Sequence, residues 1–208
     1  MVAQSTVAQS TKRCPASRTS ENKDEMTMTT WKIDTAHTDV VFAAKHMMVT
    51  TVRGKLGDVS GSIETEGDDA SSARGEIAIG VASLNTGSDY RDKHLRSADF
   101  FDAEAHPIAT FRLTSVTPHG DELDVAGDLT IRGTTRPVVL RAESLGFYVS
   151  MEGARRAGFS ATGTIDRKAF GLDWNVALET GGWLVGDDIK LTIDAAFEEA
   201  KVALPVAA

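Results

Sequence analysis

The segment 86–102 holds the densest group of side chains that could do chemistry, because it combines acids, bases, an imidazole and aromatic rings. Ser88 is a residue type that begins helices, and the charges that follow have helical spacing, so we predict a short helix over 88–97. Two interpretations of this helix stay open. It is either a lid whose charges are solvated, or it turns Arg91 or His94 inward as a polar contact for a ligand head group.

Histidine is the other residue type that could do chemistry, and the chain has five. No two of them have the i,i+4 or His-x-His spacing that places two imidazoles on one metal ion. The single cysteine, Cys14, excludes a zinc site built from thiolates. We therefore predict no metal centre and expect His46 to be a histidine of the core or its rim. The five are His37, His46, His94, His106 and His119.

Motifs of common enzyme classes are missing from the sequence. It has no G-x-S-x-G elbow, no G-x-x-x-x-G-K-[ST] loop and no G-x-G-x-x-G after a strand. Carboxylates in the clearest strands lie on the polar phase of the alternation, which argues against a buried acid and base pair. We predict no catalytic residue. A barrel enzyme that acts on a small apolar substrate stays open as the alternative, since a dispersed site leaves no motif.

A period of two dominates the chain from Trp31 onward, as in strands with one apolar and one polar face. Leu129 and Ile131, for example, alternate with Asp128 and Thr130. Long strands, short connections and one helix favour an all-β fold, and a barrel rather than a sandwich. We predict an eight-stranded antiparallel barrel with the short helix over its mouth. Strands are expected at 38–47, 51–66, 74–81, 107–118, 121–132, 136–150, 157–167 and 189–197.

Composition limits the partners that the protein can have. The chain has 208 residues, 41% of them hydrophobic, which suits one domain with a sizeable core. Its net charge of -8 gives no broad positive field for a phosphate backbone, so nucleic acid is not an expected partner. No apolar run reaches the length of a membrane-spanning helix.

Residues 1–30 differ from the rest, being rich in Ser and Thr and free of aromatic residues. Such a segment cannot bury enough apolar surface to fold, so we predict a disordered tail at 1–30, a barrel at 31–199 and a C-terminal tail at 200–208. The first residues lack the apolar stretch of a secretory signal, and we expect the protein to be cytoplasmic.

Several separated motifs occur in the order found in one protein family, and the chain resembles the YceI-like family of polyisoprenoid-binding proteins over residues 31 to about 197. The match rests on Trp31-x-Ile33-Asp34-x-x-His37, Lys45-His46, Arg91-Asp92-x-His94-Leu95-x-Ser97-x-Asp99-Phe100-Phe101, Pro107-x-x-x-Phe111, Gly127-Asp128-Leu129-Thr130-Ile131-Arg132-Gly133-Thr134-Thr135-Arg136-Pro137-Val138 and Gly158-Phe159-x-Ala161-x-Gly163-x-Ile165-x-Arg167-x-x-Phe170-Gly171-Leu172. Many relatives are periplasmic.

The resemblance implies a lipocalin-like barrel whose apolar channel holds a long-chain isoprenoid, an isoprenoid quinone or a similar lipid, without a further cofactor. The implied role is binding or carriage of that lipid, and a homodimer stays open. Alternation suggests which side chains face inward, and Trp174 and Trp183 are expected to close one end. Contacts with the ligand are expected from Phe42, His46, Ile79, Arg91, His94, Phe100, Phe101, Phe111, Leu129, Ile131, Phe159 and Trp174.

Overall fold

The computed structural model describes residues 27–179 and 181–200, and most of them lie in one antiparallel sheet. The predicted tails fall almost wholly outside these ranges, since residues 1–26 and 201–208 are not among the described residues. No helix within the described ranges is long and apolar enough to cross a membrane.

The sheet closes because its last strand, β10 (Val185–Glu199), pairs with two N-terminal strands. Its second half pairs with β1 (Met28–Ile33), with Phe197 opposite Ile33. Its first half pairs with β2 (Asp39–His46), which is followed by β3 (Thr50–Leu56). The ring runs β1, β4, β5, β6, β7, β8, β9, β10 and back to β1, which confirms the predicted eight-stranded antiparallel barrel.

The remaining elements complete the ring and its connections. A single α-helix, α1 (Asp89–Arg96), occurs among the described residues and confirms the helix predicted over 88–97. The other strands are β4 (Asp58–Glu66), β5 (Asp69–Gly80), β6 (Ile108–His119), β7 (Glu122–Ile131), β8 (Thr134–Val149) and β9 (Arg155–Asp166). The described residues also form three short 3-10 helices, which are η1 (Thr35–His37), η2 (Val81–Ser83) and η3 (Arg167–Phe170).

Two predicted boundaries differ from the structure. β1 begins at Met28, inside the tail predicted for 1–30, and Thr30 pairs with Glu64. Composition missed this because a sheet ladder uses backbone groups and does not require apolar side chains. The strand predicted for 51–66 is divided at Gly57 into β3 and β4. The 3-10 helix η1 divides β1 from β2 in the same way. β1 with β2, and β3 with β4, therefore each form one bent strand.

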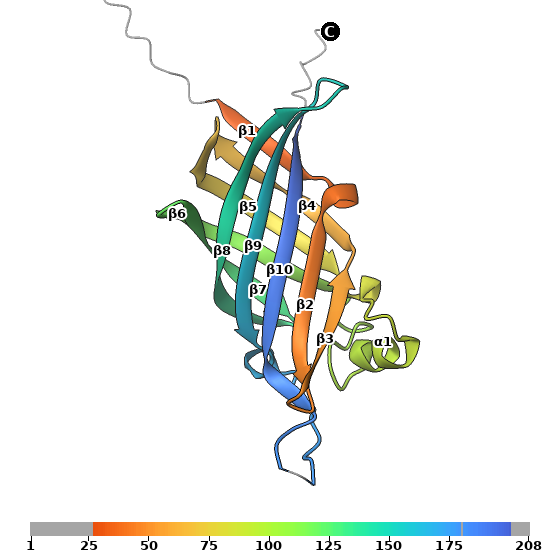
Figure 1. Ribbon diagram of the computed structural model, residues 1–208. Helices are drawn as coiled ribbons and strands as arrows, with labels where there is room; N and C mark the ends of the chain where they lie inside the picture. The colour runs from red at the N-terminus through yellow and green to blue at the C-terminus, as the bar shows by residue number, and fades with distance from the viewer. Residues whose placement is uncertain (1–26, 180, 201–208) are drawn as a thin grey trace, which may run out of the picture.

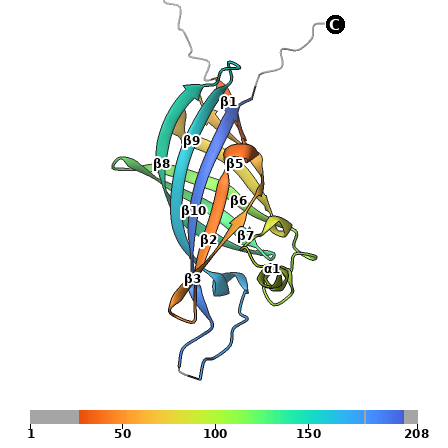
Figure 2. The same ribbon diagram turned by 45° about the vertical axis from the view of Figure 1, so that its right-hand side comes forward.

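The barrel has two different ends, which Figures 1 and 2 show from two sides. The α1 end carries α1, η3 and the turn between β2 and β3. The β8–β9 end carries the turn between β8 and β9, the start of β1 and the end of β10.

Strand pairing around the ring is incomplete at the β8–β9 end. β6 pairs only with residues 75–80 of β5, and β7 pairs only with residues 134–142 of β8. Residues 69–74 and 143–149 therefore have one partner strand each within the described chain. Figure 1 shows the hairpin of β6 and β7 projecting away from the wall at this level. Two strand edges of the barrel wall are therefore unpaired here within the described chain.

Candidate functional site

A cavity of about 320 Å³ runs through the barrel and is the candidate functional site. This volume falls in the range of small-molecule pockets, which is about 300–1,000 Å³. Strand alternation makes the wall apolar. On β10, Ile189, Leu191 and Ile193 face the cavity, whereas Lys190 and Thr192 are exposed. β7 repeats this pattern, with Leu129 lining the cavity and Asp128 paired outside with an arginine.

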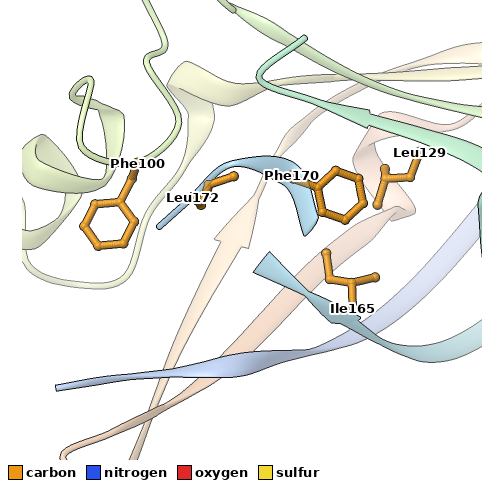
Figure 3. Packing of buried hydrophobic residues seen from close by; sticks show 5 residues of the cluster. All are labelled: Phe100, Leu129, Ile165, Phe170 and Leu172. Atoms are coloured by element: carbon orange, nitrogen blue, oxygen red, sulfur yellow. The ribbon is translucent and has the colours of Figure 1, made fainter. Parts of the chain in front are cut away.

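Apolar packing closes the cavity at the α1 end. Phe170 and Leu172 follow the end of β9 and are 2% and 5% exposed. They pack with Ile165 and Leu129 of the wall, and Phe100 joins this cluster from the segment after α1 (Figure 3). Gly171 allows the tight turn between the two inserted side chains, because its φ of 76° is a left-handed conformation.

One buried charge, Arg167, fixes this closure in place. Arg167 is among the residues that line the cavity and is 3% exposed. Its guanidinium donates to the carbonyls of Gly186 and Trp174 at 3.0 Å each and to that of Leu172. It also pairs with Asp187 at 3.2 Å. Because protein groups already accept these hydrogen bonds, Arg167 acts as a structural tie and not as a free contact for a ligand.

The segment before and within α1 is held by a second polar network. Asp92 is buried, and its carboxylate accepts hydrogen bonds from the backbone N–H and the hydroxyl of Thr86. Arg91 donates to the same threonine, at 2.7 Å to Oγ1 and 2.9 Å to the carbonyl oxygen. Arg96 donates to the carbonyl of Leu84. These bonds anchor α1 against the end of the barrel.

A different closure operates at the β8–β9 end, where one guanidinium lies against two aromatic rings. The central carbon of Arg155 is 5.4 Å from the ring centroid of Trp31 and 4.9 Å from that of Phe147. Its Nη2 donates to Asp68 in the turn between β4 and β5, and its Nη1 lies 3.5 Å from a Glu199 oxygen. We call Arg155, Asp68 and Glu199 the Arg155 bridge.

The Arg155 bridge is partly open to solvent. The hydrogen bond from Arg155 holds the pKa of the Asp68 carboxyl below its ordinary value, and the same bond raises the pKa of Arg155. Exposed ion pairs contribute little to stability because water and salt screen them. Beneath the bridge, the Trp31 indole N–H donates to Thr65 at 2.9 Å. Two polar residues of the cavity wall, Thr65 and Asp68, thus lie at this end.

Most of the residues expected to contact a ligand do line the cavity, although contact itself stays a prediction. Strand alternation places those that belong to strands on the wall. The segment after α1 places the two neighbouring phenylalanines there. The residues on the cavity wall are Phe42, Ile79, Phe100, Phe101, Phe111, Leu129, Ile131 and Phe159.

Four residues expected to contact a ligand are not on the wall. His94 pairs with Asp99 at 3.0 Å, and its ring packs edge-on against Trp174 with centroids 4.6 Å apart. This geometry agrees with a lid, since both rings pack at the α1 end. The charges of α1 are not all solvated, as that interpretation expected, because Asp92 is buried and bonded to Thr86. Arg91 is turned to the loop before α1, as described above. His46 is half-buried at the end of β2, as expected for a rim histidine.

Trp183 was expected to close one end together with Trp174, and this expectation is wrong for Trp183. Its side chain is half-exposed and is not part of the cavity wall. The residue belongs to the long connection between η3 and β10, which extends beyond the barrel, so alternation in a strand does not apply to it.

Sequence reasoning missed the polar end of the cavity. Thr65 and Asp68 line it, and Trp31, Phe147 and Arg155 meet there from three different elements. The only signal in the sequence is a pair of adjacent arginines at the start of an otherwise apolar and small-residue strand. Within the part of the chain that the structure describes, no three His, Cys, Asp or Glu side chains are grouped closely enough to hold a metal ion.

Comparison with known proteins agrees with this architecture. A family model described as the YceI-like domain matches residues 31–197. The UPF0312 protein SAB2563 of Staphylococcus aureus (strain bovine RF122 / ET3-1) is 38% identical over 171 residues, which cover 82% of this chain and 98% of that protein.

Solved structures show the same fold. The Campylobacter jejuni YceI protein is 31% identical with a TM-score of 0.64, over 76% of this chain and 90% of that one. Burkholderia cenocepacia BcnA is 23% identical with a TM-score of 0.66, over 79% and 98% of the two chains. A domain from Saccharophagus degradans, described as a polyisoprenoid binding domain, is 14% identical with a TM-score of 0.60, over 82% and 98%.

Proposed function

Because the chain belongs to the YceI-like family, we propose that its barrel binds one long-chain apolar lipid, of the isoprenoid or isoprenoid-quinone class, and carries it without catalysis. The observation that carries this proposal is the apolar cavity wall. Its only charged residues among those that the structure describes, Arg167 and Asp68, lie near its two ends. The name of the Saccharophagus degradans domain supports the ligand class.

Burial of the lipid chain supplies the binding energy. Each methylene group removed from water contributes about 0.8 kcal/mol, so ten such groups give about 8 kcal/mol before the costs of association. No charged or catalytic group is needed for retention. The apolar contribution has no direction, so the polar groups at the ends of the cavity must orient the lipid.

We infer that the polar head of the lipid lies at the β8–β9 end. The Arg155 bridge offers partly exposed hydrogen-bonding groups there, whereas Arg167 at the α1 end is buried and already bonded to protein oxygens. The bridge holds two carboxylates and one guanidinium, so it disfavours an anionic head. A neutral head group, such as a quinone or an alcohol, fits this charge balance.

Mass spectrometry of an organic extract of the purified protein tests the proposal. We expect a long-chain lipid with a neutral head at near-stoichiometric amount. Ala161→Phe places a bulky ring in the cavity and should remove most of this lipid, because Ala161 lines the wall. Thr162→Phe is the matched control, since this neighbour on β9 is exposed and should retain the lipid. Protein that is empty and turns over added esters or epoxides would support a barrel enzyme instead.

A further inference from the structure

The turn between β2 and β3 exposes apolar side chains in a backbone conformation that disfavours them. Met47 and Met48 have φ values of 51° and 65°, and the Val49 N–H donates to the His46 carbonyl at 3.3 Å. Two consecutive positive φ values occur in type I′ turns, where Asn and Gly are preferred because other residues are strained. The turn therefore carries two methionines at positions where backbone stability favours small or polar residues.

The neighbouring loop adds to the same surface. The Met47 N–H donates to the carbonyl of Leu184 at 2.8 Å, and the Leu184 N–H donates to the carbonyl of Val176 at 2.9 Å. Trp183 directly precedes Leu184 in the chain, and the Nζ of Lys168 lies 5.9 Å from the centroid of its ring. The exposed fractions are 46% for Met47, 63% for Met48 and 51% for Trp183. We call this surface the apolar tip, made of Met47, Met48, Val49, Val176 and Trp183, all of which are exposed.

The β2–β3 hairpin beside the apolar tip carries positive charge, whereas the loop that carries Val176 and Trp183 contains Asp173 and Glu179. The net charge of the chain is -8, yet residues 40–57 contain Lys45, Arg53 and Lys55 and no acidic residue. Lys45 and Arg53 are exposed and have no carboxylate within ion-pair distance in the described part of the chain. Both point outward, since Phe42 and Ala44 of the same hairpin face the cavity.

We propose that the apolar tip docks on the surface of an anionic lipid bilayer. Tryptophan and flexible apolar side chains insert among lipid head groups, and nearby lysine and arginine attract lipid phosphates. A second copy of the chain fits less well, because a stable dimer buries about 800 Å² on each partner. The exposed parts of five side chains fall short of that area. Docking holds the α1 end at the bilayer, and it does not depend on which lipid the cavity takes.

Vesicle binding by the full chain tests this inference. Vesicles of phosphatidylcholine alone are compared with vesicles of equal parts phosphatidylcholine and phosphatidylglycerol, by co-sedimentation and by quenching of tryptophan fluorescence with brominated lipid. We expect binding to the anionic vesicles that is about tenfold tighter. Lys45→Glu with Arg53→Glu should remove this preference. Absence of binding to either vesicle, or retention of the preference in the charge-reversed variant, would overturn the proposal.

A variant of the turn separates docking from folding. Met47→Asn with Met48→Gly supplies the residues that the turn conformation favours, so its melting temperature should equal or exceed that of the wild type, while vesicle binding falls by about tenfold or more. Met151→Asn is the control, because Met151 is fully exposed at the opposite end of the barrel and should leave binding unchanged. Unchanged binding in the turn variant, or dimerisation that this variant abolishes, would contradict membrane docking.

Discussion

At the α1 end the cavity is closed by buried apolar side chains, whereas at the β8–β9 end one arginine lies between two acids above two aromatic rings. The first closure is part of the hydrophobic core and cannot move without exposing Phe170 and Leu172. The second consists of partly exposed charges beside strand edges that lack a partner in the described chain. The α1 end therefore supports the fold, while the β8–β9 end can open at little cost to the stability of the protein.

The largest effect is expected from Phe170→Ala at the α1 end. Removing a buried phenylalanine ring costs about 3–5 kcal/mol, and each kcal/mol lowers the melting temperature of a domain of this size by about 2–4 °C. Thermal unfolding should therefore occur at a much lower temperature. Phe147→Ala at the other end is the counterpart, because that ring is half-exposed and its loss should change the melting temperature far less. Equal shifts in the two variants would remove the distinction between the ends.

A smaller and more specific effect is expected from Arg155→Met. The substitution keeps an apolar stem over Trp31 and removes the charge, so stability should hardly change while the bound lipid dissociates faster by a factor of about three. Release of a fluorescent long-chain alcohol to acceptor vesicles measures this rate. Arg112→Met removes an exposed ion pair with Asp128 on the outer wall and should leave the release rate unaltered. If both variants release the lipid at the wild-type rate, the bridge does not control exchange.

The smallest effect is expected from acid. The pKa of Asp68 is lowered from its ordinary value of 3.8 in the folded protein, so the bridge is complete above that value and is lost as the pH falls through the lowered pKa. Lipid release by the wild type should accelerate in that acidic range. The Asp68→Asn variant should release lipid at the faster rate already at neutral pH. Acid should not accelerate its release further through residue 68. A wild-type rate that is flat down to the onset of acid unfolding would argue against this role.

The sequence allowed the wall of the cavity to be predicted but not its polar end. Alternation around Leu129 and Asp128 correctly assigns one to the cavity and the other to solvent, because a strand forces neighbours onto opposite faces. Asp68 and Arg155 are 87 residues apart and meet only when the ring closes. No local pattern in the sequence predicts such a contact.

Two other positions show where local reasoning fails. The helix at α1 was predictable from the types and spacing of its residues, although Ser88 at its N-cap makes no capping hydrogen bond with its side chain. The direction of His94 was not predictable, because its ring packs against Trp174, which comes from a distant loop. β1 was missed in part because Met28 and Thr30 join the sheet through backbone bonds to β4. In both cases tertiary pairing, and not composition, decides the outcome.

The pairing of β10 with both β1 and β2 also governs the order of events during synthesis. Chains emerge from the ribosome from the N-terminus, so the first strands of the ring appear long before the strand that joins them. Trp31 meets Glu199 only when nearly the whole chain has been made. Until then the ring cannot close, because β10 is the strand that lies between β9 and β1. A lipid that reaches the nascent protein at that stage is enclosed by the last strand and does not have to thread through either end.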